Sequence, residues 1–260
     1  MMSYFRLNLR ELMAFRLNFT MVFGQLIAGT IQFFLFWLLL GNFSLDSTFG
    51  SWSFREISFI VAFYHLNFSL FMLLSVGFLF LPILVIRGDL DDILILPVSP
   101  TKGLLGRSLS PDRLLYPLVS VVILVLALVI NPMVDPLLLL LGILVAIAAS
   151  LLENIFMMSF NLLSFWIGGM QAVVQALNNV YTAKQFPLDG LRGAGRFLLT
   201  FIIPIFFMAT FPAEIITQRI TFETLLWGVG SLAGLLVIWI WLFRSLWFRG
   251  LRNYQSGGSL

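Results

Sequence analysis

The chain has 260 residues, of which 60% are hydrophobic and 10% are charged, and its mean hydropathy is +1.02. This composition excludes a soluble globular domain, which needs more polar surface, and predicts a polytopic membrane protein. The lack of cysteine and the single histidine exclude disulfides, cysteine catalysis and a His-cluster metal site within the chain, so we expect no metal and no cofactor. The net charge is +3, but the basic residues are dispersed among loops, and we expect no nucleic-acid partner.

The segment before the first apolar run has helical periodicity. Phe5 and Leu9 fall on one helical face, and Arg6 and Arg10 fall on another. This pattern predicts an amphipathic interfacial helix over residues 1–19, lying on the cytoplasmic leaflet. A plain cytoplasmic extension of the first span is the alternative.

Six apolar runs are long enough to cross a membrane, which takes about 20 residues. They cover residues 20–42, 57–86, 114–131, 136–168, 197–216 and 224–243. If the N-terminus is cytoplasmic, only Arg55 and Arg219 of the 15 basic residues lie outside, whereas Lys184, Arg192 and Arg196 lie inside. Because cytoplasmic loops are enriched in Lys and Arg, this asymmetry predicts cytoplasmic N- and C-termini. The expected fold class is an all-α integral membrane protein with six transmembrane helices.

The spans 57–86 and 136–168 exceed the thickness of the bilayer. As straight helices they would be about 45 Å long at about 1.5 Å per residue, against a hydrocarbon core of about 30 Å. Each must therefore tilt or project into the cytoplasm. Projection of the first would lift the loop at 87–113 clear of the lipid.

The fifth span is interrupted by prolines. It contains Pro204, and Pro212 precedes an amphipathic run from Ile215 to Phe222. Short, proline-broken apolar pieces indicate a partial re-entrant element on the outer side. An ordinary extracellular loop is the alternative.

The loop at 87–113 contains closely spaced carboxylates followed by a Pro-x-x-Pro motif. The residues of interest are Arg87, Asp89, Asp91, Asp92, Pro97 and Pro100. Because the flanking segments are apolar, this loop must face water, and we expect it to be a docking surface for another protein. The alternative is a solvated charged loop that only keeps the turn out of the lipid.

Among the polar residues inside predicted spans, four are candidate intramembrane sites: Glu153, Asn154, Asn161 and His65. An ionisable group in a span costs a few kcal/mol, so Glu153 must face protein or water. It either lies on a substrate or proton path or holds a neighbouring helix by hydrogen bonds. His65 is next to Tyr64, and we expect it to pack between helices rather than bind a ligand.

No Gly-rich phosphate loop ending in Lys-Ser or Lys-Thr occurs in the sequence, and neither does a Gly-x-Ser-x-Gly or His-Glu-x-x-His motif. We therefore expect that this chain does not bind or hydrolyse ATP and is not an enzyme.

Three local patterns occur in order along the chain. They are Arg87-Gly-Asp-Leu-Asp91 through Pro97-x-x-Pro100, then Ile203-Pro204 followed by Phe211-Pro212-Ala213, and finally Trp247-Phe-Arg-Gly250-Leu-Arg252-Asn-Tyr254-Gln-Ser256. Together with the six spans, they make nearly the full length resemble the ABC-2 type transporter permeases. The resemblance implies one transmembrane domain over 1–260, with 87–113 as the cytoplasmic coupling loop.

The resemblance also implies partners and a location. A separate nucleotide-binding ATPase would dock on the coupling loop, with Asp89, Asp91 and Asp92 as candidate contacts. Two permease subunits, either identical or siblings, would form the substrate path of an exporter, surrounded by lipid in the bacterial inner membrane. The alternative is a proton-coupled secondary transporter in which Glu153 relays the proton.

Overall fold

A computed structural model describes residues 48–49, 51–108 and 111–255, with isolated positions between residues 20 and 35. The predicted amphipathic helix at 1–19 lies outside the described residues, and so does most of the predicted span at 20–42.

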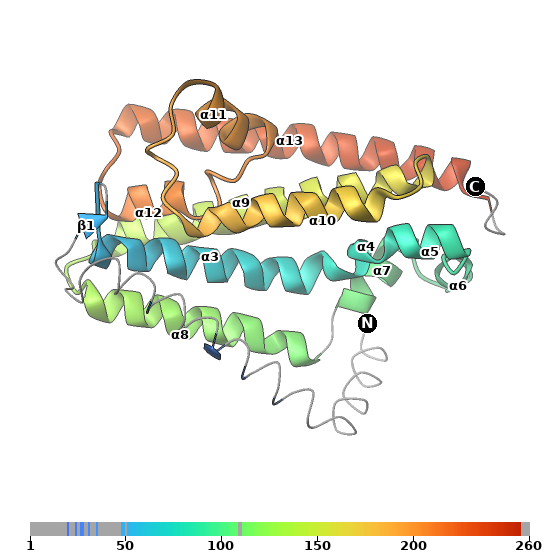
Figure 1. Cartoon of the computed structure of the whole chain (residues 1–260), viewed down its shortest axis with the longest axis horizontal. Coiled ribbons are helices and arrows are strands. Elements are labelled where there is room, and N and C mark those ends of the chain that lie inside the picture. The colour runs from blue at the N-terminus through green and yellow to red at the C-terminus, as the bar shows by residue number, and fades with distance from the viewer. Residues whose placement is uncertain are drawn as a thin grey trace.

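The long helices lie side by side in an elongated bundle (Figure 1). They are α3 (Phe54–Leu74), α8 (Leu115–Ile130), α9 (Pro136–Leu162) and α13 (Phe222–Asn253). Of the described helices, α3, α13 and α9 with its 3-10 extension η2 (Leu163–Phe165) are long and apolar enough to cross a membrane, and α8 is a shorter apolar helix. Helix α9 is central, because it packs against α3, α13 and several shorter helices.

Local sequence signals start two of these helices. The short strands β1 (Thr48–Phe49) and β2 (Trp52–Ser53) pair just before α3. The Ser53 hydroxyl then accepts from the Glu56 amide, and the Glu56 carboxylate accepts from the Ser53 amide, which is a capping box. The carboxylate of Asp135 caps α9, with Pro136 at the first helical position.

The prediction of one helix over 57–86 is wrong, because this segment is three helices. They are α3, α4 (Val76–Leu79) and α5 (Leu81–Arg87). The first break is at Ser75, whose hydroxyl donates to Asn154 of α9, and the second precedes Pro82, which has no amide hydrogen to continue the ladder. Beyond them, α6 (Asp91–Leu94), α7 (Pro100–Ser108) and the 3-10 helix η1 (Pro111–Leu114) lead to α8.

The predicted fifth span over 197–216 is not one helix. The segment is split into α11 (Gly193–Phe197), the π-helix η4 (Leu198–Ile202), a turn and α12 (Thr210–Ile216). Pro204 removes a backbone donor directly after η4 and prevents one long helix. Every residue of α12 is buried, and α12 packs against α9 and α3. The prolines in this segment predicted such short apolar pieces.

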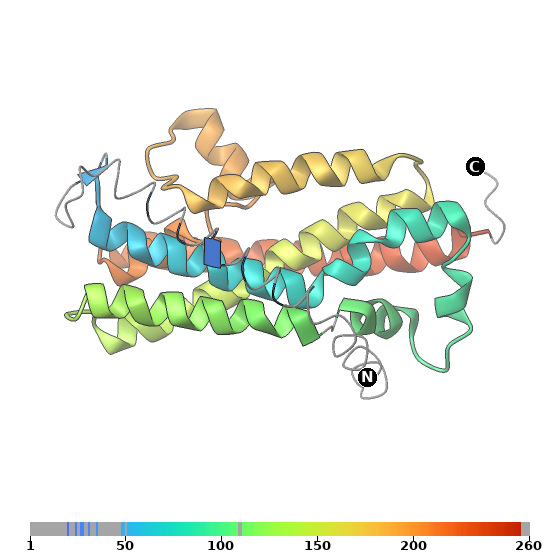
Figure 2. The same cartoon turned by 60° about the horizontal axis from the view of Figure 1, so that its bottom comes forward.

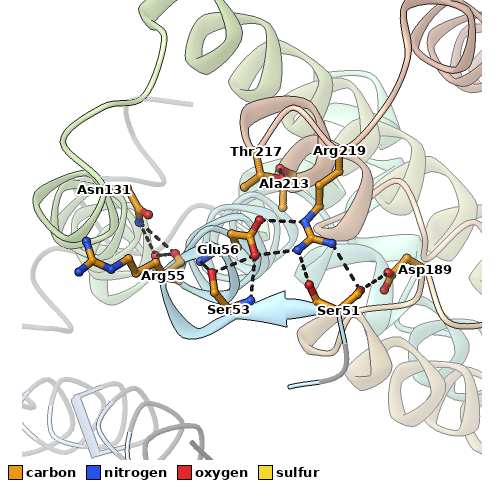
Figure 3. Close-up of polar contacts among 10 residues, drawn as sticks. Ser51, Ser53, Arg55, Glu56, Asn131, Asp189, Ala213, Thr217 and Arg219 are labelled. Atoms are coloured by element: carbon orange, nitrogen blue, oxygen red, sulfur yellow. Dashed lines mark hydrogen bonds and ion pairs between the residues drawn. The ribbon is translucent and has the colours of Figure 1, made fainter. Parts of the chain in front are cut away.

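Helix α10 (Met170–Tyr181), followed by the 3-10 helix η3 (Thr182–Gln185), runs antiparallel to α9 (Figures 1 and 2). It carries the chain back along the bundle towards β1. The Ser51 hydroxyl donates to Asp189 (3.0 Å), and the Ser51 carbonyl accepts from Arg219 (2.5 Å), as Figure 3 shows. The segment after α10 therefore lies at the β1 end, together with Arg55 and Arg219, and not at the end that bears Arg87, where it was predicted.

Candidate functional site

A buried ion pair joins η3 to α9. The Lys184 Nζ lies 2.8 Å and 2.9 Å from the two carboxylate oxygens of Glu153, and it also donates to the Asn67 Oδ1. The Lys184 and Glu153 side chains are 5% and 3% exposed. An ammonium group has three N–H donors, so Lys184 has used all of them. Each charge thus has a direct partner, which offsets part of the cost of burying it.

Amide side chains extend this pair into a polar network between α3 and α9. The Asn67 Nδ2 donates to the Ser150 hydroxyl (3.0 Å), and Asn154 donates to the Ser150 carbonyl (2.7 Å). The Asn154 Oδ1 accepts from Ser75 at the break between α3 and α4 (2.5 Å). The network fixes the position of the break relative to α9.

The other two predicted intramembrane residues have separate environments. The Asn161 Nδ2 donates to the Met157 carbonyl of its own helix (2.8 Å), and its Oδ1 has no hydrogen-bond partner among the described residues. The His65 ring packs edge-on against Tyr64, with 5.1 Å between ring centroids. In the part of the chain that the structure describes, neither side chain bonds to the Glu153–Lys184 pair.

The segment 87–113, the predicted coupling loop, begins with a sharp turn. Helix α5 ends at Arg87 and is capped by Gly88, whose φ of 77° is a left-handed conformation that glycine adopts without steric cost. Leu90 and Ile93, which follow, are fully buried and belong to a core cluster with Leu104 and Trp247. This burial ties the loop to α7 and α13.

The polar residues of the loop point away from this core. Arg87, Asp89, Asp92 and Pro97 are exposed, whereas Asp91 and Pro100 are half-buried. Beside them three apolar side chains are exposed, Leu94 at 37%, Val98 at 43% and Ile95 at 80%. We call Asp89, Asp92, Leu94, Ile95 and Val98 the acidic loop surface.

Close backbone packing connects this surface to α4. A Cβ on Gly103 would come within 2.7 Å of the Ile93 Cγ2 methyl group, and a Cβ on Gly77 would overlap the Leu104 carbonyl. The Gly77 amide also donates to the Ser108 hydroxyl (2.6 Å). Because interiors this dense transmit displacement, α6, α7 and α4 form one stiff unit.

The C-terminal end of α13 packs against the same unit. The Tyr254 hydroxyl donates to the Gly88 carbonyl (3.2 Å), and Gly250 lies directly against the Phe165 ring. Partial burial, a hydrogen bond to Asp91 and the nearby negative charges of Asp91 and Asp89 raise the pKa of Tyr254 to about 12. The tail pattern therefore supports the coupling loop, a role that the sequence did not reveal.

Sequence reasoning missed Lys184 and Asn67. The distribution of basic residues placed Lys184 in a cytoplasmic loop, and nothing in the sequence links it to Glu153, 31 residues away in the chain. The available signal was the strong amphipathic pattern of 170–181, which is typical of a helix with one face on a core.

One comparison with known proteins identifies the family that the three local patterns resemble. The sequence matches the family described as ABC-2 family transporter protein over residues 26–258. No curated protein and no solved structure matches the chain significantly. Membership implies a multi-pass membrane component that associates with an ATPase subunit. The chain therefore belongs to the ABC-2 family of transporter proteins, as a membrane component of an ABC transporter.

Proposed function

We propose that the chain is the permease subunit of an ATP-driven exporter and that its acidic loop surface binds the separate ATPase subunit. The observation that carries this proposal is the exposed combination of Asp89 and Asp92 with Ile95 on a unit packed against two long helices. Apolar side chains ringed by charges are typical of protein interfaces. The carboxylates favour a basic patch on the partner.

The stiff unit provides a route for mechanical coupling. A permease driven by a separate ATPase must receive force through contact, and packed elements transmit rigid-body displacements. Motion of α6 would pass to α4 through Gly77 and Gly103, and to α13 through Trp247. The two helices that would move are thus attached to one docking surface.

We place the α6 end in the cytoplasm of a bacterial cell, with both termini on that side. Basic residues near this end support the orientation, because cytoplasmic segments are enriched in Lys and Arg. These are Arg87, Lys102, Arg107, Arg244, Arg249 and Arg252.

We further propose a second permease subunit, either a copy or a sibling, beside the lipid-facing helices. The support comes from α13, because only 6% of its most apolar stretch is buried within the subunit. Trp227, Val237 and Trp241 are each more than half exposed there. The proton-coupled alternative has less support, because Lys184 already binds both oxygens of Glu153.

Charge reversal of the docking surface tests the proposal. Tagged protein purified from its native host should bring down an ATPase, and the double variant Asp89→Arg with Asp92→Arg should lose that partner and its ATP-dependent transport. Glu223→Arg is the matched control, because Glu223 is an exposed carboxylate at the start of α13. An ATPase that stays bound to the double variant would refute the docking surface.

A further inference from the structure

A cavity of about 300 Å³ lies between α3 and α10, beside the buried ion pair. This is at the lower end of the volumes of ligand pockets, about 300–1,000 Å³. One wall is aromatic, because the Tyr64 and Phe68 rings are stacked with 6.2 Å between centroids. Phe71 and Met72 extend this wall. The cavity thus has a flat apolar side on α3.

The opposite wall is polar. Gln175, Asn178 and Asn179 of α10 line it, and their spacing places them on one helical face. Carboxamides both donate and accept hydrogen bonds. The wall can therefore satisfy a neutral group that bears both kinds of hydrogen-bonding atom.

An unpartnered hydroxyl belongs to a residue of the same cavity. Tyr181 lines the cavity and is 3% exposed, and its hydroxyl has no hydrogen-bond partner among the described residues. Leaving a buried hydroxyl without a partner costs free energy that a bound ligand would recover. A polar ligand group bound beside Tyr181 would supply the missing partner.

The charges at the cavity select against a charged ligand. Glu153 and Lys184 both line it, and they neutralise each other. An anion would meet the Glu153 carboxylate, while the N–H donors of Lys184 are already used. A cation would have to compete with Lys184 for that carboxylate. A neutral hydroxyl can donate to a free lone pair of Glu153 without disturbing the pair.

We propose that this cavity binds the uncharged, hydroxyl-bearing head group of an amphiphile, whose apolar tail lies along Phe68, Phe71 and Met72. The assignment of such amphiphiles as the transported cargo rests on the proposed function. Binding itself needs neither the ATPase nor ATP.

Photolabelling of the whole chain in phosphatidylcholine nanodiscs tests the binding. The probe is an alkyl glucoside with a diazirine in its chain, compared with the same chain bearing a sulfate or a trimethylammonium group. We expect the glucoside to label peptides that contain Tyr64–Met72 and Gln175–Lys184. The two charged probes should label these peptides several-fold less.

Two variants locate the head group. Tyr181→Phe and Asn178→Leu should each weaken glucoside labelling about fivefold, which is the effect of losing one neutral hydrogen bond. Tyr254→Phe is the matched control, because it removes a hydroxyl at the α6 end, and it should label as the parent does. An unfolding temperature close to that of the parent shows that each variant is folded.

Two results would overturn the proposal. They are equal labelling by the charged probes and labelling that neither variant weakens. With the ATPase and ATP present, labelling should fall as the probe is moved, and labelling that ATP does not change would overturn the cargo assignment. A failed ATPase co-purification would leave the nanodisc result intact, so the two proposals fail separately.

Discussion

The middle of the bundle and its β1 end each contain an ion pair that ties the segment between α10 and α13 to the long helices. In the middle, Glu153 and Lys184 are 3% and 5% exposed, and a network of amides surrounds them. At the β1 end, Arg219 binds both oxygens of Glu56, and these side chains are 24% and 25% exposed. The same charges are therefore held in two different dielectric environments.

This difference determines what each pair contributes. A charge withdrawn from water without a partner costs several kcal/mol. Glu153 and Lys184 therefore each need the other to remain buried and charged. The outer pair is screened by water and ions, but Arg219 also stacks on Trp52, with its Cζ 4.2 Å from the ring centroid. The inner pair specifies where η3 lies, whereas the outer pair adds modest stability.

Breaking the inner pair should have the largest effect. Glu153→Gln leaves the Lys184 ammonium buried without its counter-ion and should destabilise the fold by about 3–5 kcal/mol. The measurement is thermal unfolding in a fixed lipid or detergent. Glu153→Gln combined with Lys184→Met should recover most of the loss, because no buried charge remains. A double variant as unstable as the single one would contradict this account.

Breaking the outer pair should have a smaller effect. Arg219→Met should cost about 1–2 kcal/mol, from the ion pair and the stacking on Trp52. Raising the salt concentration to about 1 M should reduce the difference between this variant and the parent, because screening then acts over about 3 Å. The same salt titration should leave the Glu153→Gln difference unchanged. Equal salt sensitivity of the two variants would show that the pairs do not differ in environment.

At the α6 end, the Tyr254 hydroxyl donates to the Gly88 carbonyl, a contact between uncharged groups. We expect the loss of this contact to have the smallest effect on stability. The pKa of Tyr254 is raised to about 12, above its ordinary value near 10. The protonated phenol is therefore favoured in the folded state, and its contribution is complete below about pH 10 and is lost as the pH rises through about 12. Ultraviolet difference absorbance between the parent and Tyr254→Phe measures this titration. A phenolate that appears near pH 10 would show that Tyr254 does not contact the loop.

The lengths of the apolar runs predicted the regular helices well. The predicted span 114–131 corresponds to α8 at 115–130, and the span 136–168 corresponds to α9 with η2. These segments are apolar over most of their length, so the bilayer requirement is sufficient to predict them. Charged residues and prolines interrupt the apolar pattern over 87–113, and the described part of this segment contains only the short helices α6, α7 and η1.

The other features of the fold depend on contacts between residues far apart in the chain, which the lengths of the apolar runs do not reveal. Hydropathy assigns any lysine to a loop, so it could not show that Lys184 pairs with Glu153 inside the bundle. The second predicted span is broken at Ser75, whose hydroxyl donates to Asn154 of another helix, a contact that the length of an apolar run cannot reveal. In the fifth span, Pro204 signalled the interruption, but the burial of all of α12 depends on its packing against α9 and α3.

Site-specific cross-linking tests the docking surface most directly. The chain has no cysteine, so Ile95→Cys introduces a unique thiol on the acidic loop surface, where Ile95 is 80% exposed. Phe222→Cys, at a position 74% exposed at the β1 end, is the control. With a reagent that joins a thiol to a lysine, Ile95→Cys should form an adduct with the co-purified ATPase, and Phe222→Cys should form none. An ATPase adduct at Phe222→Cys together with none at Ile95→Cys would contradict the proposed function.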